Sequence, residues 1–405
     1  MDKNMSMGSK GRELRSRIGV PVNAAFPRLS WNVWGARRSL SQLSVERAAS
    51  GVRNQWRQRV RPGSTQGVGP AHLLYVVPAS DRHETLWEPG VGNHTYELVM
   101  TAREFMGDSR VSCLYVDVKE PADQWHARVR DFVTKHDVTH LMAQAERDPS
   151  GSGDWSWDVL LKDMRGSWGG AFIALTYDSA YPYLLMHIER ISRVFARTLV
   201  VALDRPLTGL IRPERPTVGP VFLPISSESL HVLDEATKGV QPEYDVTFLG
   251  NVNGYPYRAE LLDELVRAGI DVTINPQAAP DGGLPGFSSY VVALKRSRIT
   301  VNFSRCNGVP VTQLKTRILE APLFSAVVVS DSPLYAQDYF ALGEEFLAYD
   351  SPQDLKAQLD RLLANPAQLE AMGARAQATA RELSSQSFWR AIDIGLSRRG
   401  LPPLR

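Results

Sequence analysis

Short apolar runs alternate with longer segments of helical periodicity from residue 72 onward. This alternation is typical of a parallel β-sheet that is covered by helices on both faces. In the first half of the chain we predict strands at residues 72–77, 112–116, 139–143, 171–176 and 198–203, and helices at 95–105, 121–135, 156–164 and 181–195. The pattern therefore predicts one doubly wound α/β domain over residues 71–225.

A second α/β unit is predicted after a polar, turn-rich segment at residues 226–243. Ser351-Pro352 and Asn365-Pro366 are clear helix starts, because a capping side chain precedes a proline at the first helical position. The predicted strands are 245–249, 271–274, 299–303, 326–329 and 346–349, and the predicted helices are 256–268, 287–296, 314–323, 333–342, 352–363 and 366–383. The unit spans residues 240–385, and a last helix within residues 386–405 is a candidate to cross back to the first domain.

The net charge of +2 hides an uneven distribution along the 405 residues. Residues 1–70 carry 13 Lys and Arg against three acidic residues, which leaves a net charge of −8 on the remainder. Prolines interrupt this leader, so we predict a disordered or partly helical basic N-terminal extension. Contact with an anionic membrane surface, contact with nucleic acid, and a transit peptide remain alternatives.

Two cysteines in a chain of this length supply neither a disulfide framework nor a structural metal site. No apolar run reaches the roughly 18 residues that a membrane span needs, and no signal peptide is recognisable. We therefore expect a cytoplasmic protein, with peripheral membrane contact through the basic leader as an option.

The segment from Ser297 to Asp331 carries the most informative chemistry. A buried strand opens into a polar loop at residues 304–312, and the predicted helix after it carries Lys315, Arg317 and Glu320. Helix amino termini and nearby cations stabilise phosphates, and a carboxylate accepts hydrogen bonds from ribose hydroxyls. The alternative is a surface ion pair between the second and third of these residues, with a solvated lysine beside it.

Four blocks of the second unit, in order and spacing, resemble glycosyltransferases of the GT-B type, which have two facing Rossmann-like domains. The similarity is greatest to the bacterial group typified by spore maturation protein glycosyltransferases. The blocks are DVTFLGNVNGYPYRAELLDEL at 245–265, SYVVALKRSRITVNFS at 289–304, QLKTRILEAPLFSAVVVSD at 313–331 and YFALGEEFLAYDSPQDLKAQLDRLLANP at 339–366. The first domain resembles that family in architecture only.

The resemblance implies that the second domain binds a nucleotide diphosphate sugar. Cations would face the diphosphate, a glutamate would face the ribose, and a glycine loop would approach the phosphates. The donor-binding residues implied are Gly250, Asn251, Arg258, Lys315, Arg317 and Glu320. Without the resemblance, Gly250 is interpreted as a glycine that marks a turn, and Arg258 as a residue on the surface of a helix. Thr312 stands where related enzymes carry the first of two glutamates, and Ser325 where they usually carry glycine.

The first domain is then expected to supply the acceptor side. His94 follows Gly90 and Gly92 at a predicted helix start, where it is a candidate base or hydrogen-bond donor to the sugar. Asp178 follows a predicted strand, where it is a candidate to orient an acceptor hydroxyl. Taken singly, the two residues read as a polar loop residue and a helix cap.

The preferred hypothesis is a glycosyltransferase that moves a sugar from a nucleotide diphosphate sugar to an unidentified acceptor, which is a glycan, a protein or a small molecule. We expect retention of configuration, no metal and no cofactor, since the nucleotide sugar is a co-substrate and the cations neutralise the leaving diphosphate. A nucleotide-sugar epimerase of the same fold and a non-catalytic binding or surface-assembly protein remain alternatives.

Overall fold

The computed structural model describes residues 70–81, 94–151, 156–177, 182–203, 217–252, 255–276, 287–306, 309–384 and 386–405. All of them belong to one unit of the chain, Gln66–Arg405. The predicted basic extension, except for Pro70, lies outside the described residues. None of the helices in the described ranges combines the length and the apolar character that crossing a bilayer requires.

The first domain is built on a parallel sheet with the strand order β2-β1-β3-β4-β5-β6. Its inner strands are buried along their whole length, as the six buried residues of β4 show. Such strands need helices on both faces, which explains their continuous apolar sequence. The strands are β1 (Leu73–Pro78), β2 (Val111–Val116), β3 (His140–Gln144), β4 (Ala171–Thr176), β5 (Thr198–Ala202) and β6 (Thr217–Val218).

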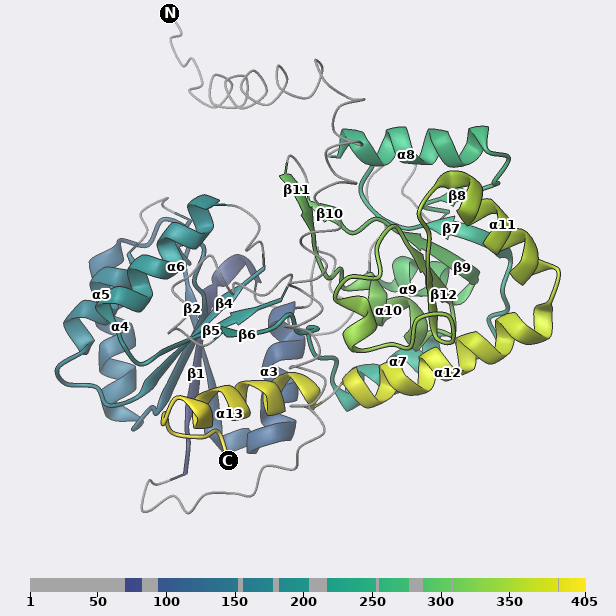
Figure 1. The fold of residues 1–405 in the computed structure, drawn as a ribbon. Helices are drawn as coiled ribbons and strands as arrows, with labels where there is room; N and C mark the ends of the chain where they lie inside the picture. The colour runs from purple at the N-terminus through teal and green to yellow at the C-terminus, as the bar shows by residue number, and fades with distance from the viewer. Residues whose placement is uncertain are drawn as a thin grey trace, which may run out of the picture. The chain divides into compact units, whose positions relative to one another are not determined.

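Helices cover both faces of this sheet (Figure 1), and a separate apolar cluster lies on each face. One face packs against α4 (Ala122–Lys135), α5 (Trp157–Met164) and α6 (Pro182–Val194). The opposite face packs against α3 (His94–Met106) and α13 (Ser387–Arg398), the last helix of the chain.

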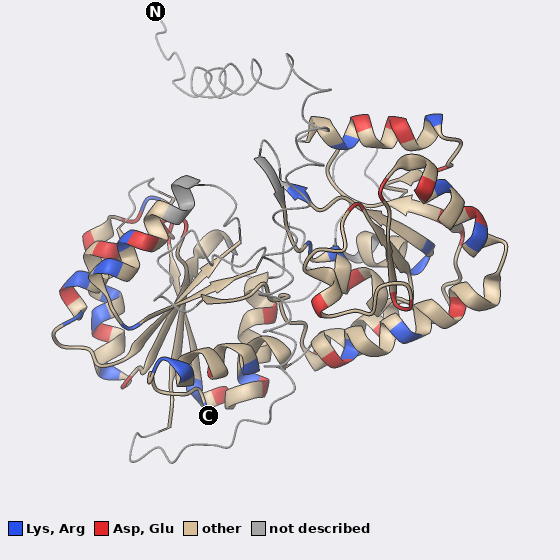
Figure 2. Ribbon diagram, in the orientation of Figure 1, with Lys and Arg blue, Asp and Glu red and all other residues tan. Residues whose placement is uncertain are grey.

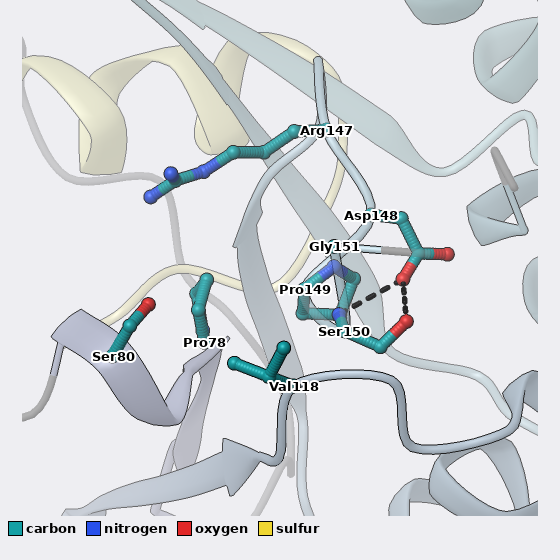
Figure 3. Close-up of a pocket in the computed structure, with 8 residues that line it drawn as sticks. All are labelled: Pro78, Ser80, Val118, Arg147, Asp148, Pro149, Ser150 and Gly151. Atoms are coloured by element: carbon teal, nitrogen blue, oxygen red, sulfur yellow. Dashed lines mark hydrogen bonds between the residues drawn. The ribbon is translucent and has the colours of Figure 1, made fainter. Parts of the chain in front are cut away.

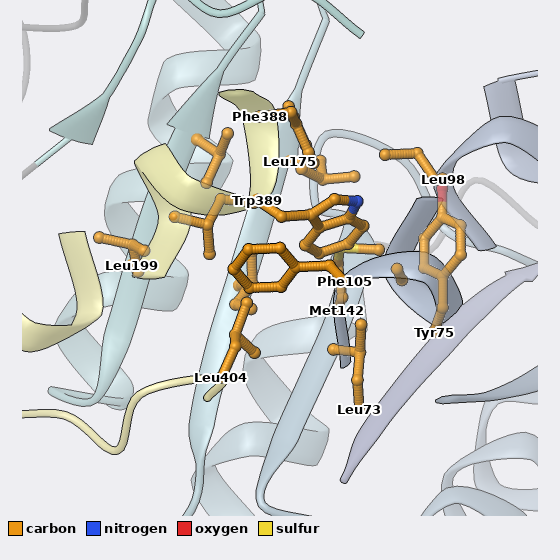
Figure 4. Packing of buried hydrophobic residues seen from close by; sticks show 14 of the residues in the cluster. Leu73, Tyr75, Leu98, Phe105, Met142, Leu175, Leu199, Phe388, Trp389 and Leu404 are labelled. Atoms are coloured by element: carbon orange, nitrogen blue, oxygen red, sulfur yellow. The ribbon is translucent and has the colours of Figure 1, made fainter. Parts of the chain in front are cut away.

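Helix α13 contacts the first sheet through large buried side chains, although it follows the second domain in sequence (Figure 4). Trp389 is fully buried and donates a hydrogen bond of 2.8 Å from Nε1 to the hydroxyl of Thr101 on α3. Gly395 allows close packing, because a Cβ there would lie 2.4 Å from a methyl group of Val218 on β6. The C-terminal residues thus complete the core of the first domain.

The second domain has a parallel sheet with the order β13-β12-β9-β7-β8. Its strands are β7 (Tyr244–Phe248), β8 (Thr273–Ile274), β9 (Ser297–Asn302), β12 (Val327–Ser330) and β13 (Phe346–Ala348). One face is covered by α7 (Ser227–Ala236), α9 (Phe287–Lys295) and α10 (Arg317–Leu323). The other packs against α8 (Pro256–Arg267) and α11 (Pro352–Leu363), and α12 (Pro366–Ser384) contributes to both clusters. Most of the charged residues of the described chain lie on the helices, and the strands carry few of them (Figure 2).

The two sheets have the same strand order when their own strands are numbered along the chain, since the first reads 2-1-3-4-5-6 and the second reads 2-1-3-4-5. In such sheets the chain reverses direction of winding between the first strand and the third, and ligands bind beyond the carboxyl ends of these strands. The fold therefore marks two positions for chemistry, one after β1 and β3 and the other after β7 and β9. Together the two domains confirm the predicted α/β fold class.

Three predicted segments differ in the structure. Residues 226–243 were expected to be a polar, turn-rich segment, but they contain α7, whose N-cap Ser226 accepts a hydrogen bond from the Ser229 amide. Residues 333–342 form only the 3-10 turn Ala336–Asp338 instead of a helix. The loop at 304–312 contains the hairpin strands β10 (Arg305–Cys306) and β11 (Val309–Thr312), so the helix predicted from 314 begins at Arg317.

The first turn of α7 is bound by acidic residues of α3. Glu97 accepts a 2.6 Å hydrogen bond from the amide of Ser226 and another from the Ser229 hydroxyl. Glu104 accepts a 2.8 Å bond from the amide of Ser227. Carboxylates satisfy the unpaired amides of a helix start and favour its dipole. Burial raises the pKa of Glu97, and the serine hydrogen bonds oppose that shift.

Candidate functional site

The residues predicted to bind the donor lie around the carboxyl ends of β7 and β9, where the strand order of the second sheet reverses. Gly250 and Asn251 follow β7, and Ser304 and Arg305 follow β9. Asn275 holds Gly250 from both sides: its side-chain oxygen accepts from the Gly250 amide at 2.8 Å, and its nitrogen donates to the Gly250 carbonyl at 2.9 Å. The glycine loop is therefore fixed in place by the residue after β8.

Gly250 lies directly beside Arg317. A Cβ at this position would lie 2.9 Å from Nη2 of the arginine and 3.4 Å from the ring of Phe248. The guanidinium of Arg317 lies 5.3 Å from the centre of the same ring, which is within the range of a cation–π contact. The absence of a side chain at Gly250 thus leaves room for an arginine head at the sheet edge.

Lys315 precedes α10 instead of lying within it, so the predicted placement in a first helical turn is wrong. The hairpin β10–β11 takes up the chain that the sequence pattern assigned to a loop. The ammonium of Lys315 donates to the side-chain oxygen of Gln313. Burial raises the pKa of Asp331, and the charge of Lys315 is one of the influences that oppose this rise. Lys315 therefore lies in the irregular segment before α10, and Arg317 is the first residue of α10.

Glu320 is hydrogen-bonded by Tyr290 of α9, whose hydroxyl donates to Oε2 at 2.7 Å. Burial is the largest cause of the raised pKa of Glu320, and the Tyr290 hydrogen bond and the charge of Arg317 oppose it. Burial also raises the pKa of Tyr290. A partly buried, hydrogen-bonded carboxylate differs from the solvated ion pair that was the alternative interpretation of these positions.

Arg258 acts behind the glycine loop. Its side chain is buried, stacks at 3.8 Å over the ring of Tyr255 and donates from Nη1 to the carbonyl of Asn251 at 2.8 Å. Tyr257 continues this support, because its hydroxyl donates to the Arg305 carbonyl at 2.6 Å. The structure thus places Arg258 as a residue that positions the loop between β7 and α8.

Asp331, at the end of β12, is a member of this cluster that the sequence did not single out. Its Oδ1 accepts from the Ser304 amide at 2.7 Å and from the Ser304 hydroxyl at 2.5 Å. Burial raises the pKa of Asp331, and the Ser304 hydrogen bonds together with Arg305 and Lys315 act in the opposite direction. Its position after a predicted strand was the signal that could have identified it.

In the first domain, His94 lies at the start of α3, with its ring 5.7 Å from the ring of Tyr177 in an edge-to-face arrangement. Glu146, which follows β3, accepts from the Thr176 hydroxyl at 2.5 Å and from the Tyr177 amide at 2.9 Å. Burial raises the pKa of Tyr177, and the neighbouring Tyr75 and Glu146 add to that shift. Asp178, the other predicted catalytic residue, lies outside the described residues.

A pocket with a volume of about 240 Å³ lies at the carboxyl edge of the first sheet (Figure 3). The loops after β1, β2 and β3 line it with Pro78, Ser80, Val118, Arg147, Asp148, Pro149, Ser150 and Gly151. The sequence indicated no site here, although the segment directly follows a predicted strand. Among the described residues, no group of three or more His, Cys, Asp or Glu side chains is arranged to hold a metal ion.

Sequence and structure comparisons find proteins that are similar in fold. Residues 231–391 match the family model described as glycosyl transferase-like. Solved structures that cover nearly the whole described fold are glycosyltransferases of the GT-B type. The chain therefore has a GT-B glycosyltransferase fold, and its carboxyl-terminal part is glycosyltransferase-like in sequence. A search of curated proteins finds no match.

Three solved structures illustrate this similarity. HepE from Anabaena, in complex with UDP-glucose, is 13% identical with a TM-score of 0.54, over 81% of this chain and 99% of that chain. Sucrose-phosphate synthase from Thermosynechococcus elongatus is 12% identical with a TM-score of 0.52, over 82% of this chain and 98% of its own. An α-glucosyltransferase in complex with UDP-glucose and DNA is 11% identical with a TM-score of 0.52, over 81% and 100%. At these identities the similarity concerns the fold.

Proposed function

We propose that this protein is a glycosyltransferase that moves a sugar from a nucleotide diphosphate sugar to an acceptor. The observation that carries the proposal is the edge after β7 and β9, where Gly250 adjoins Arg317 and where the charge of Arg317 acts on the partly buried Glu320. Lys315 lies near the same edge, beside Asp331. A cationic, glycine-lined edge at the switch point of a parallel sheet suits a diphosphate with an attached ribose. The family match over residues 231–391 supports the same assignment.

In this proposal the leaving diphosphate is neutralised by Lys315 and Arg317, and Glu320 accepts hydrogen bonds from the ribose. Negative charge grows on the diphosphate as the bond to the anomeric carbon breaks. Preorganised cations stabilise that charge, and by analogy with an oxyanion-hole donor the loss of one costs about 2.7–4 kcal/mol of barrier. Arg258 acts indirectly, by holding the Asn251 carbonyl and so the loop that carries Gly250.

His94 and Asp178 are the proposed groups on the acceptor side. His94 would hydrogen-bond the sugar or accept a proton, and Asp178 would orient the acceptor hydroxyl. Retention of configuration and metal-independent transfer belong to the same proposal, because the two cations of the second domain supply the charge that a metal would otherwise bring. UDP-glucose is the first donor to test, since the HepE and α-glucosyltransferase complexes contain it.

Incubation of the protein with a panel of nucleotide sugars tests this function. Slow release of nucleoside diphosphate supports glycosyl transfer, because water replaces the missing acceptor. An isomerised donor would instead support a nucleotide-sugar epimerase. The absence of any thermal shift with all nucleotides would favour a non-catalytic binding protein and would overturn the proposal.

A further inference from the structure

Helix α3 of the first domain contacts the start of α7, where the chain enters the second domain. Glu97 accepts a 2.6 Å hydrogen bond from the Ser226 amide and another from the Ser229 hydroxyl. Glu104, which lies two turns further along α3, accepts from the Ser227 amide at 2.8 Å. Two carboxylates of one domain therefore bind the first turn of a helix of the other.

This contact lies beside both places where the described chain passes between the domains. One crossing precedes α7, and the other follows α12 and leads to α13. The Ile225 amide joins the two crossings, because it donates a 2.7 Å hydrogen bond to the Ser384 carbonyl. Tyr96 of α3 also packs against the apolar cluster of the second domain. Motion between two domains is absorbed by a few residues at such crossings, so a contact placed here restrains that motion.

Glu97 is almost completely buried, with 7% of its surface exposed, and acidic residues surround it. Burial raises the pKa of Glu97, the hydrogen bonds from the serines oppose this rise, and the charge of Glu104 adds to it. Glu228 supplies a further negative charge in the first turn of α7. On the neighbouring α12, Arg381 is bonded to Asp234 of α7 at 3.0 Å. The ionised form of Glu97 is therefore unfavourable in this contact.

Protonation of Glu97 leaves its hydrogen bonds possible. A protonated carboxyl keeps an oxygen that accepts from the Ser226 amide, and it gains an O–H that can donate to the Ser229 hydroxyl. The two forms then differ in the cost of keeping a charge out of water. If α7 separates from α3, water reaches Glu97 and its pKa returns toward the ordinary value of 4.5. The proton thus binds more tightly to the joined form, and a falling pH favours joining.

We propose that Glu97 makes the contact between α3 and α7 a proton-controlled latch: the protonated carboxyl holds the first turn of α7 and restrains the two domains, and ionisation loosens this hold. The latch has its full strength below the ordinary range of a glutamate. It weakens as the pH rises from about 4.5 to the raised pKa of Glu97, and it is constant above that pKa. This direction is opposite to that of a salt bridge, whose carboxylate must be ionised.

Amide hydrogen exchange of the whole protein at several pH values tests the latch. Helix α4 is the internal reference, because it lies on the opposite face of the first sheet and its exchange corrects for the intrinsic effect of pH. Relative to α4, the protection of α7 should fall several-fold as the pH rises from about 4.5 to about 8, and by at most about tenfold per pH unit. A relative protection that is constant, or that increases with pH, overturns the proposal.

Three variants assign the effect to Glu97. Glu97→Gln keeps an acceptor and a donor without a charge, so α7 should stay protected at every pH. Glu97→Ala removes the hold and should lower the protection at every pH; if this variant does not fold, the glutamine variant still decides. Glu104→Gln is the matched control, because Glu104 belongs to the same contact but is exposed, and it should keep the dependence of the wild type. A dependence that persists in Glu97→Gln, or that Glu104→Gln removes, overturns the role of Glu97.

A distance measurement shows whether the latch acts on the domains. Spin labels at Lys162→Cys on α5 and Glu260→Cys on α8 are exposed, and Cys113→Ser and Cys306→Ser remove the native thiols. Pulsed electron resonance should give a narrower distance distribution at low pH than at high pH, and a narrow distribution at both in the presence of Glu97→Gln. Identical distributions at the two pH values would mean that only the end of α7 opens, which overturns the latch. No nucleotide sugar is needed, so the result is independent of the proposed glycosyl transfer.

Discussion

Gly250 offers a sharp perturbation of the proposed donor side, because its lack of a side chain leaves room for the guanidinium of Arg317. In a Gly250→Ala variant the new methyl group would lie 2.9 Å from Nη2 of Arg317. Ordinary contacts need about 3.5–4.0 Å, so the guanidinium must move by about 0.6–1 Å. Its stacking on Phe248 at 5.3 Å opposes that movement. Overpacking of this kind costs about 1–3 kcal/mol of folding stability.

The same displacement should weaken donor binding. A hydrogen bond to a charged group contributes about 1.5–3 kcal/mol, so loss of the Arg317 contact should weaken the affinity for UDP about 10- to 100-fold. Calorimetric titration of UDP into both proteins measures this change. Gly269→Ala is the matched control, because Gly269 has φ +82 and lies after α8, where its substitution strains the backbone without reaching the site.

A double-variant cycle decides whether Arg317 mediates the effect. In an Arg317→Ala background, Gly250→Ala should cause little further loss of affinity, since the displaced group is already absent. Unchanged UDP affinity in Gly250→Ala would refute the reasoning. So would a full additional loss in the background that lacks the arginine.

Three further predictions concern pH and stability. Burial lowers the pKa of His140 to about 4 from 6.5, and its ring is bonded to the carbonyl of Pro402. As the pH falls, the unfolded chain protonates this histidine before the folded chain does. The free energy of unfolding should therefore decrease by about 3 kcal/mol between pH 6.5 and pH 4. Urea unfolding at several pH values measures this effect: the difference in unfolding free energy between wild type and His140→Gln should decrease by this amount as the pH falls. Ser325 has φ +66, where side chains are strained, so Ser325→Gly should raise the unfolding free energy by about 0.5–1 kcal/mol; a lower melting temperature contradicts this. Burial raises the pKa of Glu320, so UDP affinity should fall on acidification at a pH above the usual glutamate range, and Glu320→Gln should remove that dependence.

The sequence predicted the elements of this fold well because buried parallel strands and amphipathic helices leave strong periodic signals. Helix α7 was missed, since only Ser229 and Leu233 of its residues are buried and its apolar periodicity is therefore weak. Its clearest signal was the cap at Ser226. The common strand order of the two sheets could not be read from the sequence, because strand pairing is set by contacts between distant residues.

The sequence predicted that the candidate site lies at the carboxyl edge of the second sheet, but it did not predict how the side chains are arranged there. Lys315 and Arg317 were predicted as site residues from their position after a strand, and the hairpin β10–β11 places the helix start three residues later than predicted. The place of Arg258 behind the loop depends on its stacking on Tyr255, which no spacing reveals. The pocket that Arg147 lines was overlooked, although it too follows a predicted strand.

Donor turnover in variants of the two cations tests the central claim most directly. UDP release from UDP-glucose would be measured for wild type, Lys315→Ala and Arg317→Ala, with the melting temperature of each. Lys295→Ala, at the end of α9, is the control. We predict that turnover falls about 100-fold or more in each site variant, in keeping with about 2.7–4 kcal/mol of lost stabilisation, while the melting temperature changes little. Unchanged turnover in both site variants, from a wild type that releases UDP, would contradict the account.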